Sequence, residues 1–199
     1  RDSRYSFQSR RTMKAAQELY EGIDVAGMGA VGLITYMRTD SLRISDEAKA
    51  AAADLIKELY GAEYLPEKPR VFKSKNNAQD AHEAIRPSNV NWTPEMLKKD
   101  LTGEQYRLYR LVWSRFVACQ MANAVYDNVV VDAGSAGYLF RANYSEQKFA
   151  GYTAVYEEAK DEETSEVRRP LPSLKQGDAV DLKQVTKEQQ FTQPPARYT

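Results

Sequence analysis

Hydrophobic residues recur with helical spacing through the first 122 residues of the chain. Apolar side chains return every three or four positions in three segments, which predicts helices over residues 12–20, 45–59 and 102–121. The last of these is the strongest prediction, because Thr102 and Gln105 fit the capping-box pattern at its start. We therefore predict a compact helical domain over residues 1–122.

Proline marks two further helix boundaries in this first region. Thr93 followed by Pro94 is typical of a helix start, with a capping hydroxyl before an N1 proline. The segment AQDAHEAI, residues 78–85, also has a helical pattern, and Pro87 disfavours helix at the residue before it. We predict a short helix there that stops at Arg86.

After Asn123 the hydrophobic period changes from 3.6 to 2, which indicates β-strands. Four segments show this alternation, with turn-forming residues between them: 124–134, 137–145, 148–158 and 178–187. We predict a twisted sheet or partial barrel, incomplete because the chain stops at QPPARYT and lacks an initiator Met, as an excised piece of a larger protein does. The predicted fold class is α+β, with a second, β-rich domain over residues 123–199.

Composition excludes several classes of protein. No apolar run approaches the roughly 18–20 residues that a membrane span needs, and no signal peptide is visible. A single cysteine, Cys119, excludes a disulfide framework and is expected to be a buried, inert thiol. A single histidine, His82, excludes a multi-histidine metal centre. The net charge is zero, so charge alone indicates no polyanionic partner.

The segment GLITYMRTDS, residues 32–41, combines a buried-looking strand with a polar end. Leu33 to Met37 is apolar, and in an extended chain Tyr36 and Arg38 point the same way. A neighbouring cation favours the phenolate form of tyrosine, which is the stronger nucleophile, and a guanidinium can also bind a phosphate. Taken alone, the pair fits a strand-end tyrosine beside a solvated arginine better than a catalytic site.

A second polar cluster lies in AHEAIRPS, residues 81–88. His82 and Arg86 are four positions apart and would share one face of a helix, with Glu83 beside them. Such a face can contact a phosphate and handle a proton, although a lone His–Arg pair more often makes surface contacts.

The two clusters together change this interpretation. GLITYMRTDS, then AHEAIRPS, RLVWSRFVACQM and FTQPPARYT, resemble in order the central part of the bacterial type IA DNA topoisomerase I family. The resemblance spans essentially the whole chain, and the combination of the first two motifs is specific. It overrides the structural interpretation of each cluster taken alone.

The resemblance implies a role for each matched residue. Tyr36 matches the nucleophile that attacks a phosphodiester of single-stranded DNA and forms a 5′-phosphotyrosine link. Arg38 matches the arginine that contacts the scissile phosphate, and His82 matches an active-site histidine that assists DNA binding. The remaining matched residues are carried over as DNA-binding or support residues: Thr35, Asp40 and Arg86.

The resemblance also implies a larger context. The helical domain would be a winged-helix-like lid, and the β region part of an arch in a toroidal multidomain enzyme that relaxes negative supercoils without ATP. The expected partners are single-stranded segments of negatively supercoiled DNA and the remaining Toprim and DNA-binding domains of the same polypeptide, in a cytoplasmic, nucleoid-associated monomer. Mg²⁺ is implied for that enzyme, with no metal site in this chain, and the fragment alone is expected to be inactive and to bind DNA poorly.

Other interpretations of the sequence remain open. The same core occurs in topoisomerase III and reverse gyrase, although Met37 favours topoisomerase I over topoisomerase III, which usually has proline there. A non-catalytic single-stranded DNA-binding module on the same scaffold would keep Arg38, His82 and Arg86 without forming a covalent adduct. A purely structural domain with a fortuitous Tyr-x-Arg pair would have no affinity for DNA.

Overall fold

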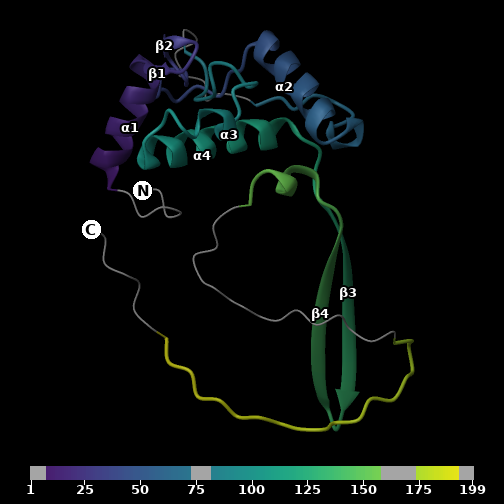
Figure 1. Ribbon diagram of the computed structural model, residues 1–199. Coiled ribbons are helices and arrows are strands. Elements are labelled where there is room, and N and C mark those ends of the chain that lie inside the picture. The colour runs from purple at the N-terminus through teal and green to yellow at the C-terminus, as the bar shows by residue number, and fades with distance from the viewer. Residues whose placement is uncertain (1–7, 73–81, 158–173, 193–199) are drawn as a thin grey trace. The chain divides into compact units, whose positions relative to one another are not determined.

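The chain divides into two units in a computed structural model that describes residues 8–72, 82–157 and 174–192. The first unit comprises Arg1–Asp127 and Glu146–Ser165, and the second comprises Asn128–Ser145 and Glu166–Thr199. The other helices of the first unit pack against one long helix, which runs along one side of them in Figure 1. The division into two domains after residue 122 stays a prediction.

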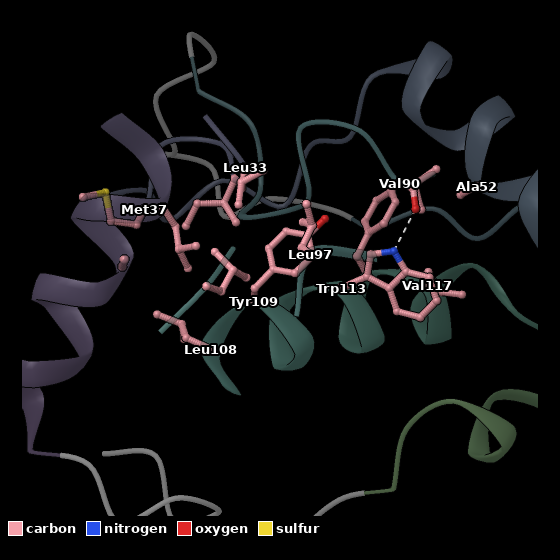
Figure 2. Close-up of a cluster of buried hydrophobic side chains, with 14 of the residues drawn as sticks. Leu33, Met37, Ala52, Val90, Leu97, Leu108, Tyr109, Trp113 and Val117 are labelled. Atoms are coloured by element: carbon pink, nitrogen blue, oxygen red, sulfur yellow. Dashed lines mark hydrogen bonds between the residues drawn. The ribbon is translucent and has the colours of Figure 1, made fainter. Parts of the chain in front are cut away.

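The long helix is α4, Gly103–Gln120, and helices α1, α2 and α3 all pack against it. Its start is the predicted capping box: the Thr102 hydroxyl accepts from the Gln105 backbone N–H, and the Gln105 side chain accepts from the Thr102 N–H. Tyr109 and Trp113 project from it into the core, and Figure 2 shows them among aliphatic side chains. The predicted apolar stripe of this helix is confirmed as core.

Three other predicted helices are present with small shifts at their ends. Helix α1 spans Ser9–Glu21, helix α2 spans Asp46–Leu59, and helix α3 spans Pro94–Leu97. The Ser45 hydroxyl caps α2 by accepting from the Ala48 N–H at 3.3 Å, and the Thr93 hydroxyl caps α3. The Thr93 cap was predicted from the sequence, and the cap at Ser45 agrees with the predicted helix start at residue 45.

A small hairpin between α1 and the tyrosine segment was not predicted. Strand β1, Ile23–Val25, pairs antiparallel with strand β2, Gly29–Val31, and the turn between them contains Gly27 at a positive φ of 80°. The glycines at positions 22, 27, 29 and 32 of GIDVAGMGAVG interrupt the period of 2, because glycine supplies no side chain to count as inside or outside.

Two of the four predicted strands after residue 123 form a hairpin. Strand β3, Val125–Ser135, and strand β4, Tyr138–Phe149, pair with each other. Their two-residue turn, Ala136-Gly137, has positive φ at both positions, as a type I′ turn requires. The described residues therefore combine helices with antiparallel strand pairs and form no closed barrel, which confirms the α+β class.

The other two predicted strands are wrong within the described residues. The segment from 148 turns into a 3-10 helix, Gly151–Ala154, because Gly151 has φ of +49° and lies so close to Asn123 that a Cβ there would approach its carbonyl carbon to 2.5 Å. Residues 178–187 form no strand, and Leu182 is exposed. An alternating pattern becomes a strand only where another strand offers its hydrogen-bonding edge, and no described residues offer one there.

Two further local predictions are corrected. Residues 82–85 are not helical, and the rest of the predicted helix, 78–81, lies outside the described residues, as does most of FTQPPARYT. The segment Leu33 to Met37 is not a strand but makes one isolated antiparallel bridge, Ile34 with Pro87. Its burial was predicted correctly: Leu33, Ile34 and Met37 all lie in the core.

Two predictions from composition concern membrane-spanning helices and the thiol of Cys119. No helix in the described ranges is long and apolar enough to cross a membrane. The Cys119 thiol donates to the Phe116 carbonyl at 3.0 Å, and its burial raises its pKa, which disfavours the reactive thiolate. Cys119 is half-buried and not fully buried, and the direction of its pKa agrees with the predicted inert thiol.

Candidate functional site

Tyr36 follows the β1–β2 hairpin on a segment that is anchored in the core from both sides. Leu33 and Ile34 before it and Met37 after it are buried, while the Tyr36 ring is half-buried against the core cluster. Because its neighbours in sequence fill the core, the tyrosine is held at the surface of a rigid support. Such a support suits a group that must meet a substrate with defined geometry.

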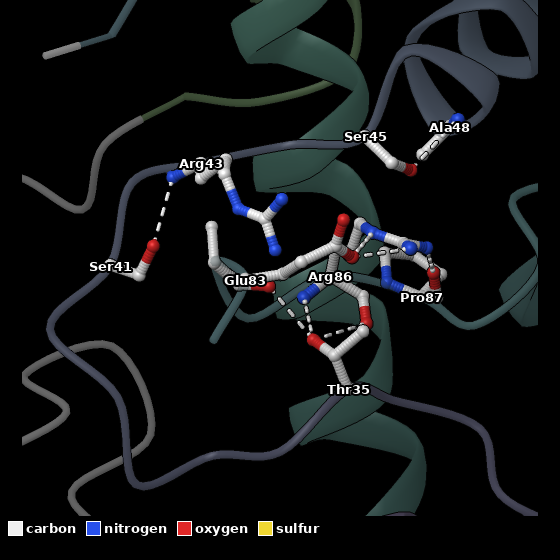
Figure 3. Close-up of polar contacts among 9 residues, drawn as sticks. Thr35, Ser41, Arg43, Ser45, Ala48, Glu83, Arg86 and Pro87 are labelled. Atoms are coloured by element: carbon white, nitrogen blue, oxygen red, sulfur yellow. Dashed lines mark hydrogen bonds and ion pairs between the residues drawn. The ribbon is translucent and has the colours of Figure 1, made fainter. Parts of the chain in front are cut away.

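The segment of residues 82–88 is joined to the tyrosine segment by hydrogen bonds that centre on Thr35. The Thr35 N–H donates to the Arg86 carbonyl at 2.9 Å, and the Thr35 hydroxyl donates to the Ala84 carbonyl at 2.8 Å. The Arg86 N–H donates back to the same hydroxyl at 3.0 Å, and the Ser88 N–H donates to the Leu33 carbonyl at 2.9 Å. Figure 3 shows the Thr35 hydroxyl among these backbone groups. Two motifs separated by about fifty residues are thereby fixed side by side.

This junction brings two aromatic rings against Tyr36. The His82 ring lies 5.6 Å from the Tyr36 ring between centroids, tilted by 35°. The Tyr20 ring, from the end of α1, lies 5.3 Å away with an edge-on angle of 63°. Tyr36 and His82 thus lie side by side through backbone pairing of their segments. The helix face predicted for His82 and Arg86 is wrong, because residues 82–86 are not helical.

Arg38 and Asp40 lie exposed just beyond the tyrosine. Met37 and Arg38 form a bend, so the straight extended geometry assumed from the sequence ends at Tyr36. Among the described residues, neither Arg38 nor Asp40 has an ion-pair or hydrogen-bond partner. The turn that follows is held by hydroxyls, since the Ser41 N–H donates to Thr39 Oγ1 at 3.0 Å. An exposed guanidinium without a protein partner is available to bind an anion.

Arg86 has a different environment. Its guanidinium contacts the Glu83 carboxylate at 2.6 and 3.0 Å and donates to the Pro87 carbonyl at 3.0 Å, and both charged side chains are largely buried. With these donors engaged inside the segment, Arg86 supports the shape of residues 83–87. Of the two roles predicted for it, this geometry favours support over direct contact with a ligand.

Two residues of the site were missed by the sequence analysis. Glu83 was noted beside His82 but not as the partner of Arg86, and Tyr20 was predicted only as the end of a helix over residues 12–20. A signal for Tyr20 exists in Gly32: a Cβ at that position would lie 2.7 Å from the Tyr20 carbonyl oxygen. Gly32, four positions before Tyr36, thus marks the close approach of another backbone.

Removing the Thr35 hydroxyl is expected to loosen this junction. In Thr35→Val the Arg86 N–H and the Ala84 carbonyl both lose a partner, which costs roughly 1–3 kcal/mol of folding free energy. Urea unfolding followed by circular dichroism measures this loss, with Thr35→Ser as the matched control that keeps the hydroxyl. A valine variant as stable as the wild type would contradict the role given to this side chain.

The residues in the described ranges do not fit a metal ion. Nowhere in the described part of the chain do three or more His, Cys, Asp or Glu side chains come together as ligands. A divalent cation needs such a set of oxygen or nitrogen donors. No chemical step at Tyr36 is therefore assigned to a metal held by these residues.

Comparisons with known proteins agree on one family. The family model described as DNA topoisomerase matches residues 1–199. The DNA topoisomerase 1 of Rickettsia felis is 46% identical over 196 residues, which are 97% of this chain and 25% of that protein. The structure of full-length topoisomerase I from Thermotoga maritima matches with a TM-score of 0.67 and 39% identity, over 80% of this chain and 25% of that one. The chain spans about a quarter of the length of these relatives.

Proposed function

Because the chain belongs to the bacterial type IA DNA topoisomerase family, we propose that Tyr36 is the nucleophile of a DNA strand-cleaving and religating site. The observation that carries this proposal is the junction at Thr35, which holds the Tyr36 ring 5.6 Å from the His82 ring. The exposed Arg38 guanidinium, two positions further on and without a partner among the described residues, supplies a phosphate-binding group.

The proposed reaction is a transesterification. The Tyr36 hydroxyl oxygen attacks the phosphorus of a phosphodiester in single-stranded DNA and forms a new O–P bond. The bond between phosphorus and the 3′ oxygen breaks, and this oxygen leaves as a 3′ hydroxyl that takes up the proton released by the tyrosine. The phosphate stays on the 5′ end of the downstream strand as a phosphotyrosine. The reverse attack by the 3′ hydroxyl restores the DNA and frees the tyrosine, so the bond energy is conserved and ATP is not needed.

Arg38, His82 and the supporting residues act on this reaction in different ways. Arg38 stabilises negative charge that develops on the phosphate oxygens in the transition state. His82, packed on the Tyr36 ring, contacts the bound DNA next to that phosphate. Thr35 and Arg86 keep the two segments in place, and the exposed Asp40 supports DNA binding beside Arg38. The remaining groups of the reaction come from outside the described residues.

We place this reaction in a larger enzyme. The substrate is a single-stranded segment of negatively supercoiled DNA, and a second strand passes through the break before religation. The Toprim and DNA-binding domains of the same polypeptide, with Mg²⁺ bound outside this chain, complete the site in a cytoplasmic monomer. The chain alone is then inactive, because it spans only a quarter of its relatives.

Relaxation of supercoiled DNA tests the proposed function. We define the chimeric enzyme as Rickettsia felis DNA topoisomerase 1 in which this chain replaces the matched quarter. We expect the chimeric enzyme with Mg²⁺ to relax negatively supercoiled plasmid, and this chain alone to leave it unchanged. If the purified, folded chimeric enzyme bound single-stranded DNA but never cleaved it, the chain would instead be a non-catalytic binding module.

Substitution of Arg38 is expected to slow cleavage without unfolding the protein. Arg38→Ala removes an exposed side chain that has no partner among the described residues, so the stability of the chain should change by less than about 0.5 kcal/mol. The rate of DNA cleavage by the chimeric enzyme should fall by roughly 10²–10³, the effect of losing one preorganised charge-stabilising donor. Single-turnover cleavage measures this rate.

Arg43→Ala is the matched control for that experiment, since Arg43 is also exposed and lies five positions further along. An equal fall in both variants would show that general positive charge, and not Arg38 in particular, assists the reaction.

A further inference from the structure

The aromatic contact between Tyr20 and Tyr36 is not explained by the core. Tyr20 is 40% exposed, whereas its neighbour Leu19 is fully buried and fills the core position of α1. The Tyr20 ring instead lies edge-on against the Tyr36 ring, 5.3 Å away between centroids. This distance and angle are those of a favourable aromatic pair.

The backbone fixes this pair from both sides. The Leu33 N–H donates to the Leu19 carbonyl at 2.7 Å, which ties the segment before Tyr36 to the last turn of α1. One residue earlier, Gly32 approaches the Tyr20 carbonyl so closely that a Cβ would lie 2.7 Å from it. Gly32 therefore lets its backbone approach the backbone of Tyr20, whereas the Cβ of any other residue would push the two backbones apart.

From these contacts we propose that Tyr20 is a positioning residue for the reaction at Tyr36; this inference rests on the proposed function. The Tyr20 ring limits the rotation of the Tyr36 side chain, while His82 contacts the same ring from the 82–88 segment. Holding a nucleophile near its attacking orientation lowers the entropic part of the barrier. The ring of Tyr20 performs this role, and its hydroxyl does not.

The test separates the ring from the hydroxyl and the cleavage rate from DNA binding. In the chimeric enzyme, Tyr20→Ala should lower the single-turnover cleavage rate at saturating DNA about tenfold, the factor expected for losing one aromatic contact. Tyr20→Phe should restore the wild-type rate. The dissociation constant of Tyr20→Ala for single-stranded DNA should stay unchanged, and its thermal midpoint should fall by no more than about 5 °C. Met13→Ala, on the same helix with the same 40% exposure, is the matched control and should have no effect.

A second variant tests the geometry independently. Gly32→Ala keeps Tyr20 but displaces its backbone, so it should lower the cleavage rate in the same way. If both changes act by misplacing Tyr36, the double variant should be no slower than the slower single variant, since the two effects are not additive.

Several results would overturn the inference. An unchanged rate in Tyr20→Ala would show that the contact is incidental. Weaker DNA binding with an unchanged saturated rate would show that Tyr20 stacks on DNA, and an equal fall in Tyr20→Phe would assign the effect to the hydroxyl. A fall in thermal midpoint beyond about 5 °C would make Tyr20 a merely structural residue. If the wild-type chimeric enzyme forms no adduct with DNA, the proposed function itself fails, which is a distinct outcome.

Discussion

Replacing Tyr36 by phenylalanine is expected to abolish covalent attachment of DNA while leaving DNA binding intact. The variant lacks the only atom that forms the new O–P bond, so no slower version of the same step remains. The ring that contacts Tyr20 and His82 is retained, and no hydrogen bond within the described residues involves the Tyr36 hydroxyl. The phenylalanine variant should therefore fold normally and bind single-stranded DNA like the wild type.

The measurement is a denaturing gel of the chimeric enzyme with labelled single-stranded DNA and Mg²⁺, together with a binding titration. Tyr20→Phe is the matched control, because it removes a hydroxyl from the adjacent ring and should form the adduct normally. An adduct that persists in Tyr36→Phe would assign the nucleophile to another residue and remove the basis of the mechanism.

The largest loss of stability is expected from Trp113→Ala. Trp113 is 6% exposed in the middle of α4, and its indole N–H donates to the Val90 carbonyl at 2.8 Å (Figure 2). Truncation leaves a large cavity between α4 and the loop before α3, and removes the partner of a buried carbonyl. Such changes cost about 3–5 kcal/mol. For a protein of this size the midpoint of thermal unfolding should fall by roughly 10 °C.

Calorimetry or circular dichroism of the chain measures this midpoint. Met96→Ala, an apolar side chain on α3 that is 59% exposed, is the control and should change the free energy of unfolding by less than about 0.5 kcal/mol. Trp113→Phe should fall between the two, because the ring remains but the hydrogen bond is lost. A stable alanine variant would show that α4 is not the centre of the core.

Helices with complete local signals could be predicted from the sequence. The capping box of Thr102 and Gln105 and the hydroxyl of Ser45 act within one helical turn, so their partners are fixed by spacing alone. Strands β3 and β4 were also predicted, since both alternate, and their pairing follows from the two residues, Ala136 and Gly137, that connect them. In each case the stabilising contacts are close in sequence.

The segments that were predicted wrongly depend instead on contacts that are distant in sequence. Residues 178–187 alternate like a strand but find no described partner strand, and residues 82–85 look helical but pair instead with Thr35. In both segments the outcome depends on chain that is distant in sequence. Local pattern cannot supply that information, because it does not say which backbone groups compete for the same hydrogen bonds.

The candidate site was predicted only in part. The resemblance to the topoisomerase family selected Tyr36 and His82, and the structure brings their rings together. The Thr35 hydroxyl joins the two segments that carry these rings, whereas the sequence analysis expected Thr35 only as a DNA-binding or support residue. The contact with Tyr20 had no signal except the close-approach glycine, Gly32, because aromatic pairs between distant segments leave no spacing in the sequence. The chemical roles of all these residues stay predictions.

The direction of the covalent link tests the central claim most directly. The chimeric enzyme is incubated with single-stranded DNA labelled at the 3′ end or at the 5′ end, denatured, and digested to identify the modified peptide. The account predicts label on the protein only from 3′-labelled DNA, release of a shortened 5′-labelled strand, and DNA attached at Tyr36. Label transferred from the 5′ end, or attachment at a residue other than Tyr36, would contradict it.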